Sequence, residues 1–444
     1  MGDERLGRRE FLWLAAGLAA VGCGSGSKKQ PAASATTGSG PGGGERTLRV
    51  LQWSHFVPAY DAWFDNEFAR RWGEANDIEV IVDHVPFNEV TARADTEVAR
   101  GVGHDVFGFV WTSAARFEDH TIDHREIVEE ARGKLGELHP LVEHTIFNPR
   151  TKRYLGFSDS WVPNITHYRA DLWESPPRTW DDVHRAGRRL KSLGHPLGLS
   201  LGEVDPDGTV SLMGLMHAYR SSVQDQDGNL TIDTPATIEA VKLMAAIYRE
   251  GMYPDVLTWD GTSNNRYLAS GTGSIILNPV SAIRAIEKQD PELASKVAIS
   301  APPAGPAGNP SPYFVNTSVV WRFARNPEMA KRFLVDLAVQ SRDVLTQSEF
   351  YNLPSFPGAV PDLRDVVATG TGRYALLADA PTWTTNLGHP GSANAAVEQV
   401  FEQAIIPKMF AAAARGEMSA EAAVKEAHAQ AKPIFDKWRE QGKI

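Results

Sequence analysis

The stretch LRVLQW at residues 48–53 opens the part of the chain that decides the fold. It reads as a strand, and two further strands are expected at residues 78–82 (IEVIV) and 105–110 (DVFGFV). Residues 60–74 carry apolar side chains close to helical spacing, and residues 90–100 read as a second helix that ends at a glycine. This alternation of strands and helices predicts βαβ units and an α/β fold with a doubly wound, mostly parallel sheet.

Aromatic side chains directly follow two of these expected strands. Trp53, His55 and Phe56 come after the first strand, and Trp111 comes after the third. In open α/β sheets, ligands sit beyond the carboxyl ends of the strands. The sequence therefore predicts that these four residues contribute to a ligand site.

Before these strands, the N-terminus of the chain has the pattern of an export signal. The chain reads RREFLWL at residues 8–14 and continues with small and apolar residues up to Cys23, its only cysteine. This apolar run is too short to span a bilayer, which takes about 20 residues. VGC at residues 21–23 resembles the end of a bacterial lipobox, which implies a twin-arginine-like signal peptide over residues 1–23 and a lipid anchor on Cys23. The alternative is a secretory signal that is cut elsewhere.

Residues 24–46 are mostly Gly, Ser, Thr, Ala, Pro and Lys, a composition that is typical of a flexible tether. Acyl chains on Cys23 would hold the following domain at the outer face of the cell membrane, so an extracytoplasmic location is expected. Because there is no second cysteine, the domain must be stable without disulfides.

The remaining chain, of roughly 400 residues, suits two domains or lobes. The net charge of −10, without long runs of one sign, argues against a nucleic-acid partner. We find no Walker loop, dinucleotide fingerprint or nucleophile elbow, and we expect no cofactor.

Six motifs, in this order and spacing, resemble one known family. They are GVGHDV (101–106), YRADLW (168–173), PPRTWDDV (176–183), GTGSIILN (271–278), VAISAPPAG (297–305) and NPEMAKRFL (326–334). Together they resemble the extracellular solute-binding proteins of ABC importers, the maltose-binding-like family 1. The resemblance covers essentially the whole chain after the tether.

The resemblance implies a type II periplasmic-binding-protein-like fold, in which two α/β lobes, each a doubly wound sheet flanked by helices, hold a ligand in the cleft between them. It implies a first lobe of residues 47–160 and 313–354, a second lobe of residues 161–312 and 355–444, and crossing segments near 157–162, 311–315 and 352–358. The implied function is that of a monomeric, non-enzymatic component that binds a small molecule, closes around it and delivers it to the transmembrane subunits of an ABC permease.

Further candidate ligand residues are aromatic or amide-bearing side chains at strand ends and in the expected crossings. Aromatic faces stack on sugar rings, and amides or carboxylates bond to hydroxyl groups, so a carbohydrate is the expected ligand. With the four residues above, the predicted site comprises Trp53, His55, Phe56, Asn88, Glu89, Trp111, Trp161, Trp259, Asn278, Tyr351, Trp383 and Asn386. We interpret the other tryptophans at positions 63, 72, 173, 321 and 438 as core or structural residues.

Several alternatives stay open at this point. The protein could be a lipid-anchored glycoside hydrolase, a binding protein for a glycerophosphodiester or a polyamine, or a binding protein that serves a receptor. Two motifs suggest metal binding: residues 225–233 resemble part of a calcium loop, and His120 and His124 are four residues apart. We interpret the first as a turn before a capped helix and the second as solvated surface, and therefore expect no metal site.

Overall fold

The computed structural model describes residues 46–444. The expected signal peptide, Cys23 and nearly all of the tether lie outside the described residues. The strands are β1 (Thr47–Trp53), β2 (Glu79–Val85), β3 (Val106–Phe109), β4 (Phe147–Asn148), β5 (Arg153–Tyr154), β6 (Ser160–Trp161), β7 (Ile165–Arg169), β8 (Ile275–Asn278), β9 (Val297–Ser300), β10 (Ser311–Pro312), β11 (Thr317–Val320), β12 (Leu353–Pro354) and β13 (Thr384–Thr385).

The α-helices are α1 (Pro58–Trp63), α2 (Arg70–Asn76), α3 (Val90–Arg100), α4 (Arg125–Leu135), α5 (Pro140–Ile146), α6 (Trp180–Ser192), α7 (Pro206–Ala218), α8 (Pro235–Gly251), α9 (Ser263–Ala269), α10 (Ser281–Gln289), α11 (Pro291–Lys296), α12 (Pro327–Val339), α13 (Ser341–Gln347), α14 (Leu363–Val367), α15 (Ala395–Glu402), α16 (Ile405–Arg415) and α17 (Ala420–Glu440). A π-helix, η1 (Phe64–Ala69), joins α1 to α2, and the 3₁₀ helices are η2 (Phe87–Glu89), η3 (Ser113–His120), η4 (Pro254–Thr258), η5 (Pro357–Ala359) and η6 (Arg373–Thr382).

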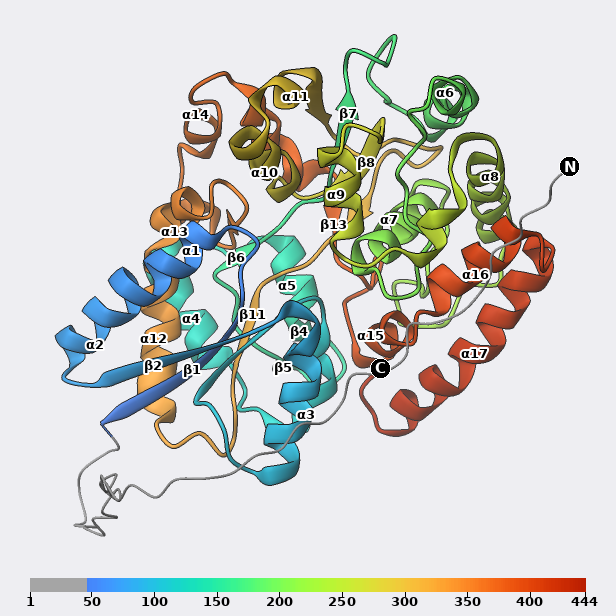
Figure 1. Ribbon diagram of the computed structural model, residues 1–444. Coiled ribbons are helices and arrows are strands. Elements are labelled where there is room, and N and C mark those ends of the chain that lie inside the picture. The colour runs from blue at the N-terminus through green and yellow to red at the C-terminus, as the bar shows by residue number, and fades with distance from the viewer. Residues whose placement is uncertain (1–45) are drawn as a thin grey trace, which may run out of the picture. The chain divides into compact units, whose positions relative to one another are not determined.

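The first sheet has the order β11-β3-β1-β2 and confirms the three strands expected near the start of the domain. β1 runs parallel to β2 and to β3, with Val50 opposite both Val82 and Val106. β11 closes the sheet antiparallel to β3. All four residues of β3 are buried, as expected for a strand that is covered on both faces. Figure 1 shows β1 and β2 near α1, α2 and α3.

The second sheet differs from the expected parallel arrangement. Its order is β8-β7-β9, and β7 pairs antiparallel with both neighbours. Each pair is joined by a long stretch of helices instead of a tight turn, so the alternation of strands and helices in the sequence does not reveal the strand direction. The alternation of strands and helices itself is confirmed, and the four-stranded and three-stranded sheets are the two largest among the described residues.

The three expected crossing segments lie side by side and are hydrogen-bonded to one another. β6 pairs with β12, and Trp161 also forms a bridge with Val315. The side chain of Asn316 joins all three, because its amide nitrogen donates to Ser160 Oγ at 2.9 Å and to Asn352 Oδ1 at 3.1 Å. Polar side chains thus tie together the three expected crossing segments.

Local signals in the sequence placed several helix starts correctly. The Thr179 side chain accepts from Asp182 N at the start of α6, and the Asp182 side chain accepts in return from Thr179 N, which forms a capping box. The Thr234 side chain caps α8 by accepting from Thr237 N at 3.2 Å, with proline at the first helical position. No helix within residues 46–444 combines the length and the apolar character that crossing a membrane requires.

The tryptophans interpreted as core residues are buried in the structure. Trp321 is fully buried, and the remaining four are at most 8% exposed. Trp72 also donates from its indole nitrogen to Asp336 Oδ2 at 2.9 Å, which fastens α2 to α12. The interpretation of these rings as structural is confirmed. The five are Trp63, Trp72, Trp173, Trp321 and Trp438.

Candidate functional site

Aromatic rings gather at the carboxyl ends of β1 and β3. Trp53 stacks on His55 with ring centroids 4.8 Å apart and lies 5.5 Å from Phe56. Tyr351, from the third crossing segment, stands 4.9 Å from His55. The rule that ligands bind beyond strand ends therefore led to side chains that the fold brings together.

Aromatic residues that the sequence analysis missed connect this group to Trp111. Phe314 lies 6.1 Å from Trp53 and 5.1 Å from Trp111, and Phe87 lies 5.5 Å from Trp53 and 6.2 Å from Trp111. Phe401, from α15, packs 5.1 Å from Trp111. We call the whole set the aromatic cluster: Trp53, His55, Phe56, Phe87, Trp111, Tyr313, Phe314, Tyr351 and Phe401.

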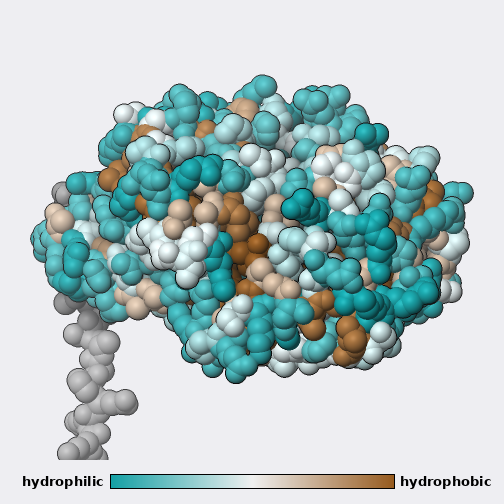
Figure 2. Space-filling model, turned by 90° about the horizontal axis from the view of Figure 1, so that it is seen from above, coloured by the Kyte–Doolittle hydropathy of each residue, from teal (hydrophilic) through white to brown (hydrophobic). Residues whose placement is uncertain are grey.

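The backbone of Trp111, in the aromatic cluster, has an unusual conformation. It follows β3 directly and has a φ of 59°, a left-handed conformation that is rare for a bulky side chain. Such backbone persists only where surrounding contacts enforce it, and it is often found in binding sites. Phe56 is the most exposed ring of the aromatic cluster, at 40%. Figure 2 shows apolar residues gathered in the middle of one face, with hydrophilic surface on both sides.

A polar network lies against the Trp111 side of the aromatic cluster. The Tyr313 hydroxyl donates to Asp207 Oδ1 at 2.7 Å, and the Tyr313 ring lies 5.2 Å from Trp111. Asp207 Oδ2 accepts from Asn278 at 2.9 Å and from Asn264 at 3.2 Å. Asn278, which was predicted from its place at the end of β8, thus connects to Trp111 through the side chains of Asp207 and Tyr313.

Asp207 has a close acidic neighbour at the start of α7. Asp205 caps the helix by accepting from the backbone nitrogen of Asp207 at 3.0 Å. Burial and the Asp207 carboxylate raise the pKa of Asp205 to about 7. Burial also raises the pKa of Asp207, although the hydrogen bonds from Tyr313, Asn264 and Asn278 oppose that rise. Protonation of Asp205 near neutral pH therefore removes one of two neighbouring buried negative charges.

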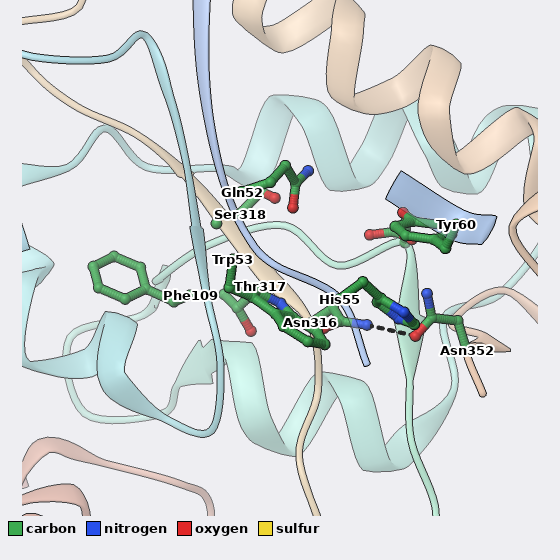
Figure 3. A pocket seen from close by; sticks show the side chains of 11 residues that line it. Gln52, Trp53, His55, Tyr60, Phe109, Asn316, Thr317, Ser318 and Asn352 are labelled. Carbon is green, nitrogen blue, oxygen red and sulfur yellow. Dashed lines mark hydrogen bonds between the residues drawn. The ribbon is translucent and has the colours of Figure 1, made fainter. Parts of the chain in front are cut away.

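A small polar cavity lies behind Trp53 and His55, where the crossing segments meet (Figure 3). Its volume of about 20 Å³ is enough for one water molecule. Figure 3 shows the hydrogen bond from Asn316 to Asn352 beside the His55 ring. The cavity is lined by Gln52, Trp53, His55, Tyr60, Gly108, Phe109, Asp159, Asn316, Thr317, Ser318 and Asn352.

Burial controls the charge of the groups around this cavity. Desolvation lowers the pKa of His55 to about 4 and raises that of Asp159 to about 6. The Nδ1 atom of His55 lies 2.9 Å from the backbone nitrogen of Val57 and 3.2 Å from its carbonyl oxygen. At neutral pH, His55 is therefore uncharged, and Asp159 is largely ionised.

Three of the predicted tryptophans have partners outside the aromatic cluster. Trp161 donates to Pro354 O at 3.1 Å within the crossing segments. Trp259 lies 4.8 Å from Tyr267 and donates to Asp255 Oδ2 at 3.2 Å. Trp383 donates to the backbone carbonyl of Asn164 at 3.3 Å. Trp259 thus has partners close in the sequence, whereas the partners of Trp161 and Trp383 lie 193 and 219 residues away.

The remaining predicted polar residues fall into two groups. Asn88 and Glu89 are exposed on η2, next to Phe87 of the aromatic cluster. Asn386 is buried, and its side chain stabilises its own loop by accepting from Gly388 N at 2.6 Å and donating to Gly391 O at 3.2 Å. Asn88 and Glu89 therefore lie close to the cluster, whereas Asn386 has its hydrogen bonds within a turn.

Both motifs that suggested metal binding have another explanation. Asp225 Oδ1 accepts from the backbone nitrogens of Asp227 and Asn229, as expected for a turn. His124 is buried, which corrects its interpretation as solvated surface, and its Nε2 accepts from Val320 N at 2.9 Å. Within residues 46–444, no group of three or more His, Cys, Asp or Glu side chains is arranged to hold a metal ion.

The sequence model of the bacterial extracellular solute-binding protein family matches residues 56–336, more than half of the chain. This chain belongs to that family. The match includes the second sheet, three of the four strands of the first sheet, Asp207 and Asn278, and five of the nine residues of the aromatic cluster. As an extracellular solute-binding protein, the chain acts outside the cytoplasm.

Relatives of this solute-binding protein are known from several bacteria. A binding protein of Brucella abortus is 28% identical over 195 residues, which cover 41% of this chain and 46% of the relative. The arabinooligosaccharide-binding protein of Bacillus subtilis is 22% identical over 222 residues, which cover 45% of this chain and 50% of the relative. The matched stretch thus spans about half the length of these relatives.

Solved structures share the fold of this solute-binding protein. A sugar transporter of Arthrobacter chlorophenolicus with bound laminaribiose has a TM-score of 0.75 at 16% identity, covering 87% of this chain and 99% of its own. A solute-binding protein of Thermotoga lettingae bound to α-D-tagatose has a TM-score of 0.73 at 17% identity, covering 88% and 99%. At this identity, the likeness establishes the two-lobe fold.

Proposed function

We propose that this protein is the substrate-binding component of an ABC-type importer and that it binds a sugar or oligosaccharide between its lobes for delivery to a membrane permease. One observation carries the proposal: the aromatic cluster adjoins the polar network of Asp207, Asn264, Asn278 and Tyr313. The flat rings suit the apolar faces of a sugar, and the carboxylate and amides suit its hydroxyl groups. Binding without conversion is the proposed activity.

The known ligands of similar proteins support a carbohydrate. The Bacillus subtilis relative is named for arabinooligosaccharides, and the two structural neighbours hold laminaribiose and tagatose. In this proposal, Trp53, Phe56, Phe87 and Trp111 contact the sugar face, while Asn88 and Glu89 lie at the rim of the cleft.

The pairing of the crossing segments supports the lobes that the family resemblance implies. Residues 47–160 and 313–354 form the first lobe, and residues 161–312 and 355–444 form the second. β6, the residues around Val315 and β12 are hydrogen-bonded together where the chain passes between the lobes. Bending confined to these segments would open and close the cleft without breaking either sheet.

Isothermal titration calorimetry of the purified protein with a panel of mono- and oligosaccharides tests this function. We expect one site per monomer and recovery of the sugar unchanged. A ligand present at about 100 times its dissociation constant should also stabilise the protein by about 2.7 kcal/mol in thermal unfolding. Hydrolysis products would show a glycoside hydrolase instead, and binding only to a polyamine or glycerophosphodiester would refute the sugar.

We further propose that the mature protein is anchored to the outer face of the cell membrane by acyl chains on Cys23. The arginine pair at residues 8–9, the short apolar run and the polar segment up to residue 46 support this proposal. A chain of about 22 such residues has a mean reach of roughly 25 Å. That reach would leave the lobes free to turn toward a permease.

A further inference from the structure

A buried glutamate connects the loop after β3 to a helix of the second lobe. Glu398, on α15, is 1% exposed. Its Oε2 accepts from the backbone nitrogen of Thr112 at 3.2 Å and from the Thr112 hydroxyl, and its Oε1 accepts from the Ser113 hydroxyl at 2.6 Å. One carboxylate therefore holds the two residues that directly follow Trp111.

Two further contacts join the same elements. The Phe401 ring, one turn along α15, packs 5.1 Å from the ring of Trp111. Arg116, on η3, donates to Glu402 at 2.6 Å. α15 in turn packs on α16 and α17, which contact α7 and α8 of the second lobe. These contacts therefore bridge the two proposed lobes beside the aromatic cluster.

We propose that Glu398 is a positioning residue that fixes the Trp111 loop against α15 and couples closure of the lobes to the uptake of a proton. The inference rests on the proposed function, because it takes the contact between the Trp111 loop and α15 to be formed when the two lobes are closed and broken when they are open. It explains how Trp111 keeps its left-handed backbone, because the next two residues are fastened by three hydrogen bonds.

The charges around Glu398 determine whether acidification favours the closed or the open protein. Burial and the adjacent Glu402 raise the pKa of Glu398 to about 7 from the ordinary 4.5, although the hydrogen bonds from Thr112 and Ser113 oppose that rise. Asp95 on α3 adds negative charge around Glu402, while Arg116 on η3 and Lys437 on α17 favour its ionised form. In an open protein, water reaches Glu398 and its pKa returns toward the ordinary value. The closed form therefore binds the proton more tightly, so acidification favours closure.

Small-angle X-ray scattering of the ligand-free protein at about pH 8 and about pH 5.5 tests the coupling. The ratio of closed to open protein should rise on the order of tenfold on acidification, with a smaller radius of gyration. Glu398→Gln fixes the neutral form, so the radius should lose its dependence on pH. Glu426→Gln, on the exposed face of α17, is the matched control and should respond as the wild type does.

A second variant keeps the test decisive if Glu398→Gln does not fold. Glu402→Gln removes the neighbouring negative charge, so the pKa of Glu398 falls and the midpoint of the transition moves to lower pH. Hydrogen exchange gives a local readout, because Glu398→Ala should increase exchange at the Thr112 amide. An unchanged midpoint in Glu402→Gln, or a full pH response in Glu398→Gln, would overturn the proposal.

These measurements use no sugar, so their outcome is separate from that of the calorimetric panel. If no sugar binds while the pH response depends on Glu398, the substrate class is wrong, and the positioning role stands. If sugars bind and Glu398→Gln abolishes binding equally at every pH, Glu398 is itself a ligand contact, and the proposed coupling is wrong.

Discussion

The hydroxyl of Tyr313 donates a 2.7 Å hydrogen bond to Oδ1 of Asp207. The bond connects the second crossing segment to the first turn of α7, 106 residues earlier in the chain. Both side chains are buried, so neither finds water if the other is removed. The connection therefore bears on stability as well as on the candidate site.

Replacing Tyr313 by Phe should destabilise the protein. The change removes the hydroxyl and leaves a buried carboxylate oxygen without that donor, at a cost of about 1–3 kcal/mol. Urea unfolding followed by circular dichroism measures the loss. Tyr253→Phe is the matched control, because Tyr253 is 40% exposed and its change should have little effect. Equal midpoints for the two variants would show that the bond contributes nothing measurable.

Replacing Trp111 by Ala should weaken sugar binding by about 2–4 kcal/mol, the range for an aromatic anchor. Trp259→Ala is a close control, since the two rings are 5% and 6% exposed and Trp259 lies outside the aromatic cluster. Both changes remove a buried ring and should lower thermal stability. Calorimetry at a temperature where both variants are folded should show a large loss of affinity for Trp111→Ala alone. Normal affinity in Trp111→Ala would mean that this ring is only structural.

Replacing Asp159 by Asn should change how stability depends on pH. Burial raises the pKa of Asp159 from 3.8 to about 6, so the folded protein binds a proton that the unfolded chain has released. The Asp159 contribution to stability therefore falls as pH rises from about 4 to about 6, by about 2–3 kcal/mol in total. The Asn variant should lose this slope in urea unfolding, whereas Asp227→Asn, at an exposed carboxyl, should keep it. A slope unchanged in Asp159→Asn would contradict the assignment.

Replacing Cys23 by Ala should release the protein from the membrane fraction, because no thiol is left to acylate. Cell fractionation and a mass shift of the wild-type N-terminal peptide measure the difference. Replacing Arg8 and Arg9 by Lys should separately stop export if the twin-arginine route is used. A Cys23→Ala protein that stays membrane-bound with unchanged processing would be evidence against the lipid anchor.

The parts of the fold that were predictable are those specified by neighbouring residues. β1, β3 and α3 follow from apolar runs and a terminal glycine, and the start of α6 follows from its capping box. The antiparallel pairing of β7 was not predictable in this way. The direction of a strand depends on the path that its long helical connections take across the sheet.

The candidate site was predictable only in part, for the same reason. Trp53 and Trp111 follow strands and were found, whereas Phe314 and Phe401 meet them only after the chain has crossed between lobes. Asp207 did have a local signal, since Asp205 followed by proline is a helix start of the kind recognised elsewhere in the chain. Its role still depends on Tyr313, which is distant in the sequence.

The Asn316 amide, which joins the three crossing segments, has a consequence for the order in which the protein folds. Its partners Ser160 and Asn352 are 156 and 36 residues away, and the whole second sheet lies between Ser160 and Asn316. Contacts that close such long loops form late, after the intervening chain has become compact. Removing the amide should therefore accelerate unfolding while leaving the folding rate nearly unchanged, so this joint contributes to the lifetime of the folded protein outside the cell.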